Sequence, residues 1–140
     1  MRTNQWLAER LHTLHEAHFA DVPIGNTLYV RFGRATRSRL GSIIAKPSSQ
    51  HTKPVTYITV NNLFRDETVP EYVIDAVLAH EFAHYTHGFH SPLEQRYKHP
   101  HRGGVVDKEI RARGAGELLD QQGRWLKTEY RDFLRRNRML

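Results

Sequence analysis

Hydrophobic residues recur at helical intervals at the start of the chain and then give way to short β-type runs. The apolar positions of 4–20 lie about one helical turn apart and predict a first helix. Runs rich in β-branched and aromatic residues predict strands at 27–32 and 55–60, and a third run predicts a strand at 40–45. The polar segment 46–54 contains two prolines and predicts a loop.

The longest uninterrupted helical pattern lies in the middle of the chain. Thr68, followed three residues later by Glu71, has the spacing of a capping box, and the pattern then continues without a breaker to His87. Gly88 follows as a natural C-terminal stop. Because the first half of this segment is apolar on several faces, we expect a buried helix from Thr68 to His87.

The remainder of the chain is predicted to be mainly helical. A loop is expected at 91–104, where prolines and glycines cluster, and a short helix at about 105–114. The last apolar positions predict an amphipathic, basic helix over about 116–140. The order of a helix, short strands and further helices predicts an α+β fold. A length of 140 residues fits one domain, so we expect a single domain over 1–140.

Composition narrows the kinds of function. The chain has no cysteine, which excludes cysteine nucleophiles and cysteine-bound zinc and fits a reducing compartment. No apolar run is long enough to span a membrane and the first residues do not form a signal peptide, so a soluble cytoplasmic protein is expected. Six of the ten histidines fall between His80 and His101. Because histidine is the commonest metal ligand, this cluster favours a metal site.

The segment His80-Glu81-Phe82-Ala83-His84 carries the strongest chemical signal. Residues four apart on a helix lie on one face, so His80 and His84 can bind the same metal ion. Glu81 suits a general base that takes a proton from water activated by zinc. A polar stripe of surface histidines is the alternative, but these side chains on a buried helix need partners, which a metal would supply. We therefore expect one zinc ion per chain.

A catalytic zinc ion needs a third protein ligand. His90 has the spacing of metzincins, but those enzymes also need a methionine beneath the metal, and the only methionines here are Met1 and Met139. His87 is expected on the far side of the helix end, in a structural or supporting role. The residue pattern alone leaves four candidates open, which are His90, His99, His101 and Glu109.

The motif helix resembles the core helix of the SprT-like metallopeptidases, which include the Spartan-type proteases that digest proteins crosslinked to DNA. Residues 73–85 carry the resemblance, supported by the N-terminal helix and by the segments Leu40-Gly41-Ser42 and Ile58–Asn61. It implies a zincin-like fold and a zinc-dependent peptidase that acts on protein substrates. The third ligand of that family is a histidine that opens a helix about fifteen residues after the motif, which implies His101.

Residues 84–92 are also similar to the WLM and YgjP-like peptidase groups. In those groups the histidine six residues after the motif is the ligand, so this second resemblance implies His90 as the alternative third ligand. The chain departs from many bacterial SprT proteins because it lacks their cysteine zinc ribbon. A role in DNA repair therefore does not follow from the resemblance of the fold.

Basic residues form two clusters in a chain whose net charge is +6. Arg34, Arg37 and Arg39 in the first cluster are candidate contacts to a phosphate backbone, and the second cluster lies within 131–138. DNA is therefore a candidate partner. The alternative interpretation is an ordinary charged surface that keeps the protein soluble.

Two further functions stay open. One is a non-catalytic DNA- or partner-binding module with a structural zinc site, which would leave Glu81 without a role. The other is a metallohydrolase that acts on a bond other than a peptide bond, because activated water is not specific for amides. For hydrolysis, the candidates to stabilise the oxyanion are Tyr85, Tyr97 and Arg102.

Overall fold

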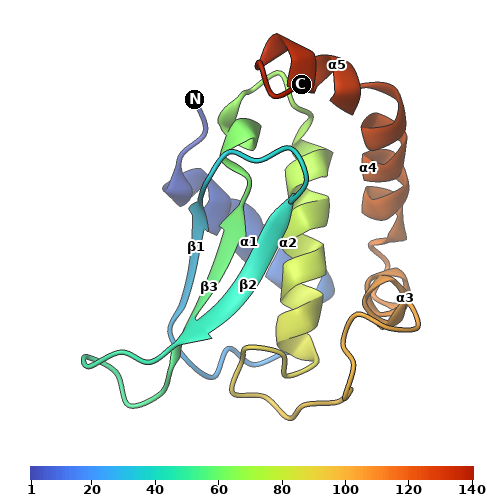
Figure 1. Cartoon of the computed structure of the whole chain (residues 1–140). Coiled ribbons are helices and arrows are strands. Elements are labelled where there is room, and N and C mark those ends of the chain that lie inside the picture. Colours follow the sequence, from blue (N-terminus) through green and yellow to red (C-terminus); the bar gives the residue numbers. More distant parts are fainter.

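The computed structural model describes residues 1–140 (Figure 1). Its three strands form one mixed sheet with the strand order β1-β3-β2. β1 (Leu28–Phe32) pairs in parallel with the central β3 (Val55–Val60), and β2 (Gly41–Lys46) pairs with β3 in the antiparallel direction. β2 is therefore an edge strand. The three predicted strands are confirmed to within one residue.

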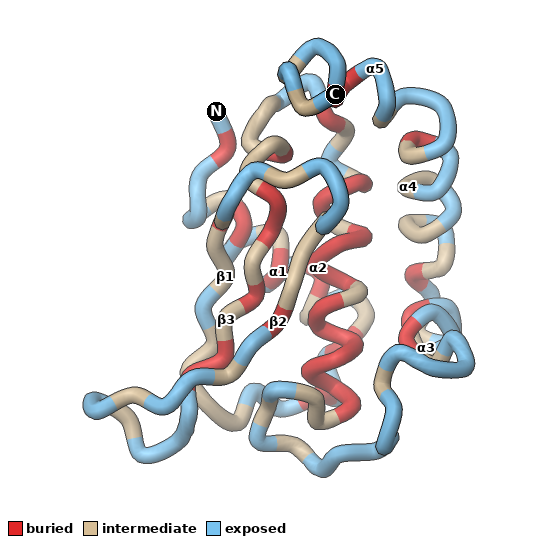
Figure 2. The backbone as a smooth tube through the Cα atoms, viewed as in Figure 1, coloured by how far each residue is buried: buried red, intermediate tan, exposed pale blue.

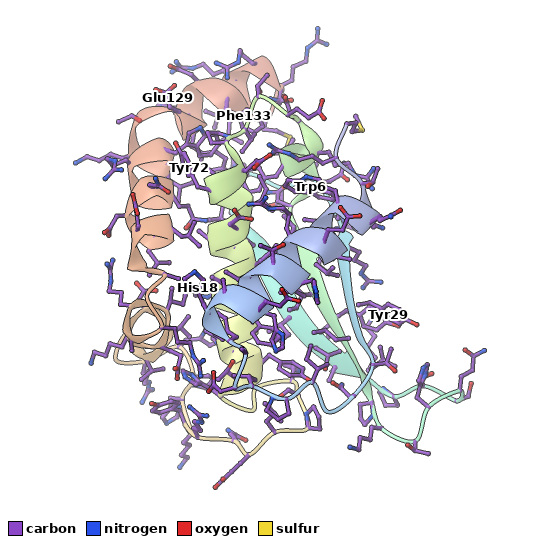
Figure 3. The ribbon with its side chains drawn as sticks, turned by 180° about the vertical axis from the view of Figure 1, so that it is seen from behind. Trp6, His18, Tyr29, Tyr72, Glu129 and Phe133 are labelled. Atoms are coloured by element: carbon purple, nitrogen blue, oxygen red, sulfur yellow. The ribbon has the colours of Figure 1, made fainter.

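Two helices cover one face of the sheet. α1 (Asn4–His18) packs on β1, while α2 (Glu71–Thr86) packs on β2 and β3. Figure 3, seen from behind, shows α1 crossing the sheet and α2 diagonally. Side chains alternate along β3, so that the side chain of Ile58 is fully buried beneath the helices while Tyr57 and Thr59 are only half-buried on the opposite face.

α2 is the buried centre of the domain. Twelve of its sixteen residues are buried, which agrees with an apolar pattern that continues around the helix. Figure 2 shows this buried surface along almost the whole of α2. The sheet and α1 lie on one side, and α3 (Val105–Ala112) and α4 (Gly116–Thr128) pack on the other. The polar side chains of Glu81 and His84 on α2 are therefore held inside the protein.

The capping box predicted at the start of α2 is wrong. The helix begins at Glu71 after Pro70, and no side chain caps it. The Thr68 hydroxyl instead donates to the Asp66 carboxylate, at 2.7 Å, inside the preceding turn. Proline fixes φ near its helical value, so the chain can enter the helix at this point without a polar cap.

The single C-terminal helix predicted over about 116–140 is also wrong. α4 ends at Thr128 and the chain turns at Glu129 into α5 (Tyr130–Arg136). The turn places Phe133 against the ring of Phe64, with centroids 6.3 Å apart. A straight helix would carry Phe133 away from Phe64. Packing between these distant residues therefore determines where α4 ends and α5 begins. The residue Phe64 lies in a short 3-10 helix, η1 (Asn62–Arg65), that the sequence pattern did not predict.

Together these elements form a single α+β domain of an N-terminal helix, a three-stranded sheet and four further α-helices, as predicted. α1 ends two residues earlier than expected, at His18. No helix has the length and the apolar composition that crossing a lipid bilayer requires.

Candidate metal centre

The second half of α2 brings His80, Glu81 and His84 together. Their ligand atoms all lie within 4.8 Å of one another, and the two imidazole rings have centroids 4.8 Å apart. One helical turn between the histidines produces this arrangement, as the spacing predicts. The three side chains form a group that can hold a metal ion.

A cavity of about 810 Å³ opens beside this group. Its walls come from the segment 38–43 at the start of β2, from α2, and from residues of α3 and α4. Gly41 lets β2 approach α2 closely, because a Cβ atom there would lie 2.5 Å from Cγ1 of Val77 and 3.7 Å from Cγ of Glu81. The group of His80, Glu81 and His84 therefore lies where the edge strand β2 approaches the central helix α2.

His84 has the properties of an unsatisfied metal ligand. The residue is 1% exposed, and neither Nδ1 nor Nε2 has a hydrogen-bond partner. Burial, together with the smaller effects of the neighbouring His80 and His101, lowers the pKa of His84 to about 4. The ring is therefore neutral at physiological pH and offers a lone pair to a cation. Buried polar atoms normally have partners, and a metal ion would satisfy one of these nitrogens.

Glu81 is a buried acid without a compensating partner. Its carboxyl group makes no hydrogen bond or ion pair, and the residue is 5% exposed. Burial raises its pKa to about 7, against the opposing effect of the positive charge on Arg39. A carboxyl group with a pKa near neutrality can both accept and release a proton under physiological conditions.

The raised pKa of Glu81 predicts a pH-dependent cost to stability in the metal-free protein. Below the ordinary pKa of 4.5 the acid is protonated in both the folded and unfolded states, and the cost is absent. Between 4.5 and about 7 only the folded state keeps the proton, so stability falls as pH rises. Above this range the cost is complete, on the order of 3 kcal/mol.

We therefore expect metal-free Glu81→Gln to be more stable than the wild type at pH 8, by on the order of 3 kcal/mol, and about equally stable at pH 4. Urea denaturation in the presence of a chelator at both pH values measures the difference. An equal gain at pH 4 and pH 8 would show that the effect does not come from the ionised carboxylate.

The structure places the two predicted third ligands differently. The ring of His101 lies with its centroid 4.7 Å from that of His84, and His101 lines the same cavity. The ring of His90 faces the edge of the sheet, where Nδ1 accepts a hydrogen bond from the backbone N–H of Ala45 at 3.1 Å. The backbone of His90 is left-handed, with φ 53°, and its carbonyl accepts from the Thr56 hydroxyl at 2.7 Å.

The remaining third-ligand candidates lie outside the cavity. Glu109 accepts hydrogen bonds from Arg113 at 2.8 Å and from Arg96 at 3.3 Å, and pairs with Nε2 of His87 at 2.7 Å. His99 is exposed on the loop. His87 is 1% exposed, and its pair with Glu109 ties the end of α2 to α3.

The predicted oxyanion candidates are not in the cavity lining. The Tyr85 hydroxyl donates to the Asn26 side chain at 2.6 Å, and the ring of Tyr97 packs on that of His87 with centroids 4.8 Å apart. Arg102 is exposed. Instead, Arg39 and Arg111 line the cavity. From the sequence alone, Arg39 was predicted only as a contact to nucleic acid and Arg111 was not predicted to have a role, because the spacing along the chain does not reveal which loop or helix faces α2.

No protein-family model, curated protein sequence or solved structure matches this chain. The functional interpretation of the metal centre therefore depends on its own residues and their surroundings.

Proposed function

We propose that the protein is a zinc-dependent metallohydrolase that cleaves peptide bonds, as SprT-like metallopeptidases do. The observation that carries the proposal is the group of His80, Glu81 and His84 at the wall of a large cavity, with both ring nitrogens of His84 buried and without partners. When bound, zinc supplies a Lewis acid that polarises a carbonyl group and lowers the pKa of water.

In this proposal His80 and His84 hold the metal and Glu81 moves the proton. The neutral rings of both histidines suit a cation, since burial lowers the pKa of each. Glu81 takes a proton from the attacking water and delivers it to the amine nitrogen that leaves. The high pKa of Glu81 makes its carboxylate a stronger base than an exposed glutamate. A structural zinc site, the alternative, would give this buried acid no function.

His101 is the third ligand that we propose. Its ring lies beside that of His84 in the cavity, whereas Nδ1 of His90 is already bonded to the backbone of β2. His101 is exposed on the loop before α3, and its side chain would turn toward His80 and His84 to complete the set. Three histidines would leave the fourth position of a tetrahedral zinc ion open for chemistry.

The free edge of β2 supports a peptide as the substrate. In an antiparallel pair, residues whose backbone groups face the partner strand alternate with residues whose groups face away. The carbonyl of Leu40 accepts from Asn61 beyond the end of β3, and the N–H of Ala45 points outward to His90. Gly41 and Ile43 therefore present free backbone groups beside the cavity, where an extended peptide can add as a further strand.

Zinc content measured by mass spectrometry tests the metal centre. We expect about one zinc ion per wild-type chain, loss of the metal in His84→Ala and in His101→Ala, and retention in His90→Ala, which serves as the matched control. Loss in His90→Ala with retention in His101→Ala would make His90 the ligand. A wild type that binds no zinc under metal-replete conditions would overturn the proposed function.

A second candidate function is binding of nucleic acid, and one contact favours it. The Tyr130 hydroxyl donates to the carbonyl of Arg37 at 2.9 Å and brings the basic helix α5 next to the loop that carries Arg34 and Arg37. Residues 22–65 contain seven lysines and arginines and no acidic residue. The two basic clusters that the sequence separates thus lie on neighbouring elements, as a polyanion would require.

Fluorescence anisotropy with a labelled single-stranded oligonucleotide tests this second candidate. We expect the double variant Arg34→Ala/Arg37→Ala to bind more weakly and to lose about 1.4 units from the slope of log affinity against log salt, since each contact to a single strand contributes about 0.7. Lys127→Ala, an exposed charge change on α4, is the control. Equal affinities and equal slopes in all three proteins would identify these arginines as ordinary surface charge.

A further inference from the structure

We propose that Arg39 is a further catalytic residue, which binds the carbonyl oxygen of the substrate and stabilises the negative charge that develops on it. The inference rests on the proposed function and assigns a role in that same reaction. Hydrolysis of an amide needs such a group, because the carbonyl oxygen becomes an oxyanion when water adds.

Arg39 is part of the wall of the cavity that contains the candidate metal ligands. It lines the same cavity as His80, Glu81 and His84, from the loop that leads into β2. A substrate carbonyl in this cavity would therefore lie within the field of the guanidinium.

Of the two arginines that line the cavity, Arg39 is the one whose guanidinium has no partner in the protein. The other one, Arg111, donates to both carboxylate oxygens of Asp120, at 2.8 and 3.4 Å. The guanidinium of Arg39 makes no hydrogen bond or ion pair within the protein, and only its backbone carbonyl is bonded. Its donors are thus available to a ligand, and the cost of breaking an existing ion pair does not arise.

The backbone beneath Arg39 is fixed by a buried amide. Asn61, 3% exposed at the end of β3, donates from Nδ2 to the carbonyl of Arg39 at 2.8 Å and also to the carbonyl of Thr36. The N–H of Asn61 donates to the carbonyl of Leu40 at 2.9 Å. These contacts anchor the backbone on both sides of Arg39, so the point from which its side chain extends into the cavity is fixed.

The chemical step balances with these residues. The water oxygen bonds to the carbonyl carbon while Glu81 takes the proton, and the π electrons of the carbonyl move to its oxygen, where Arg39 donates hydrogen bonds. The electron pair then returns, the C–N bond breaks, and the proton on Glu81 passes to the amine nitrogen. Arg39 acts only on the oxyanion and keeps its own proton throughout, as an arginine does at any physiological pH.

Steady-state hydrolysis of labelled casein by zinc-loaded variants tests the inference. We expect Arg39→Met to lower kcat by about 10²- to 10³-fold with little change in KM, because one oxyanion donor is lost. Arg39→Lys keeps the charge and should lose less, on the order of tenfold. Arg124→Met removes an exposed arginine of α4 that lies outside the cavity lining, so it is the control and should behave as the wild type.

Three measurements distinguish this role from a structural one. Zinc content and melting temperature should be the same in Arg39→Met and in the wild type. Affinity for N-phosphoryl-leucinamide, whose phosphoryl oxygens carry the charge of the tetrahedral intermediate, should fall in Arg39→Met alone.

A kcat within threefold of the wild type, unchanged affinity for this probe, or loss of zinc in Arg39→Met would overturn the role of Arg39. A wild type without zinc-dependent cleavage of casein would overturn the proposed function itself, and this inference with it.

Discussion

Glu81→Gln is expected to bind zinc as the wild type does and to lose hydrolytic activity by about a thousandfold or more. The substitution keeps the shape of the side chain, leaves His80 and His84 in place on α2 and removes only the group that can accept a proton. Positioned acids and bases contribute about 10²- to 10⁴-fold to reaction rates. Because Glu81 transfers a proton from the attacking water and to the leaving amine, the decrease in rate on its substitution should be near the upper end of that range.

Parallel measurements of zinc content and of casein hydrolysis check this expectation. Glu71→Gln, at the exposed start of the same helix, is the control and should retain full activity. If Glu81→Gln cleaves casein at the wild-type rate, the activity comes from another site or from a contaminant. If it loses zinc, the carboxylate is a ligand and the general-base role is wrong.

Zinc is expected to stabilise the folded protein strongly. The metal-free centre holds a buried histidine without partners and a buried acid with a raised pKa, and both conditions oppose folding. A ligand that binds only the folded state at a thousand times its Kd adds about 4 kcal/mol to the free energy of unfolding. In a domain of this size, that gain corresponds to a rise of about 10 °C in Tm.

Thermal unfolding with added zinc, and again after treatment with a chelator, measures this stabilisation. His84→Ala should show no rise in Tm on addition of zinc, while His12→Ala, an exposed histidine on α1, should respond as the wild type does. A rise of equal size in His84→Ala would place the stabilising metal elsewhere. An unchanged Tm in the wild type would mean that the centre does not bind zinc in the folded state.

The centre of the candidate site was predictable from sequence because it is local. Two histidines four residues apart on a helix share a face whatever the rest of the fold is, and a segment that is apolar all round must be buried. These two facts place His80 and His84 together on a buried helix, with the adjacent Glu81 beside them, whereas the cavity next to them comes from the structure. The strands were predictable for a similar reason, since their β-branched runs are short and clearly bounded.

The rest of the site depends on contacts between distant segments, which local patterns do not encode. Arg39 enters the cavity because β2 pairs with β3 and Asn61 holds the preceding loop. Arg111 enters it because α3 packs on the second half of α2. The turn between α4 and α5 likewise depends on the distant Phe64, so the amphipathic pattern alone predicts one helix where there are two.

The edge of β2 also determines how the protein behaves toward other copies of itself. An exposed strand edge invites pairing between chains, which is a first step toward aggregation. Here the strand is short, His90 occupies the outward N–H of Ala45, and Lys46 adds a charge at its end. Only the stretch from Gly41 to Ile43 stays open, and pairing over so few residues is too weak to hold another chain by itself. An extended peptide would therefore meet free backbone groups only beside the candidate metal centre, while His90 covers the outward N–H further along the strand.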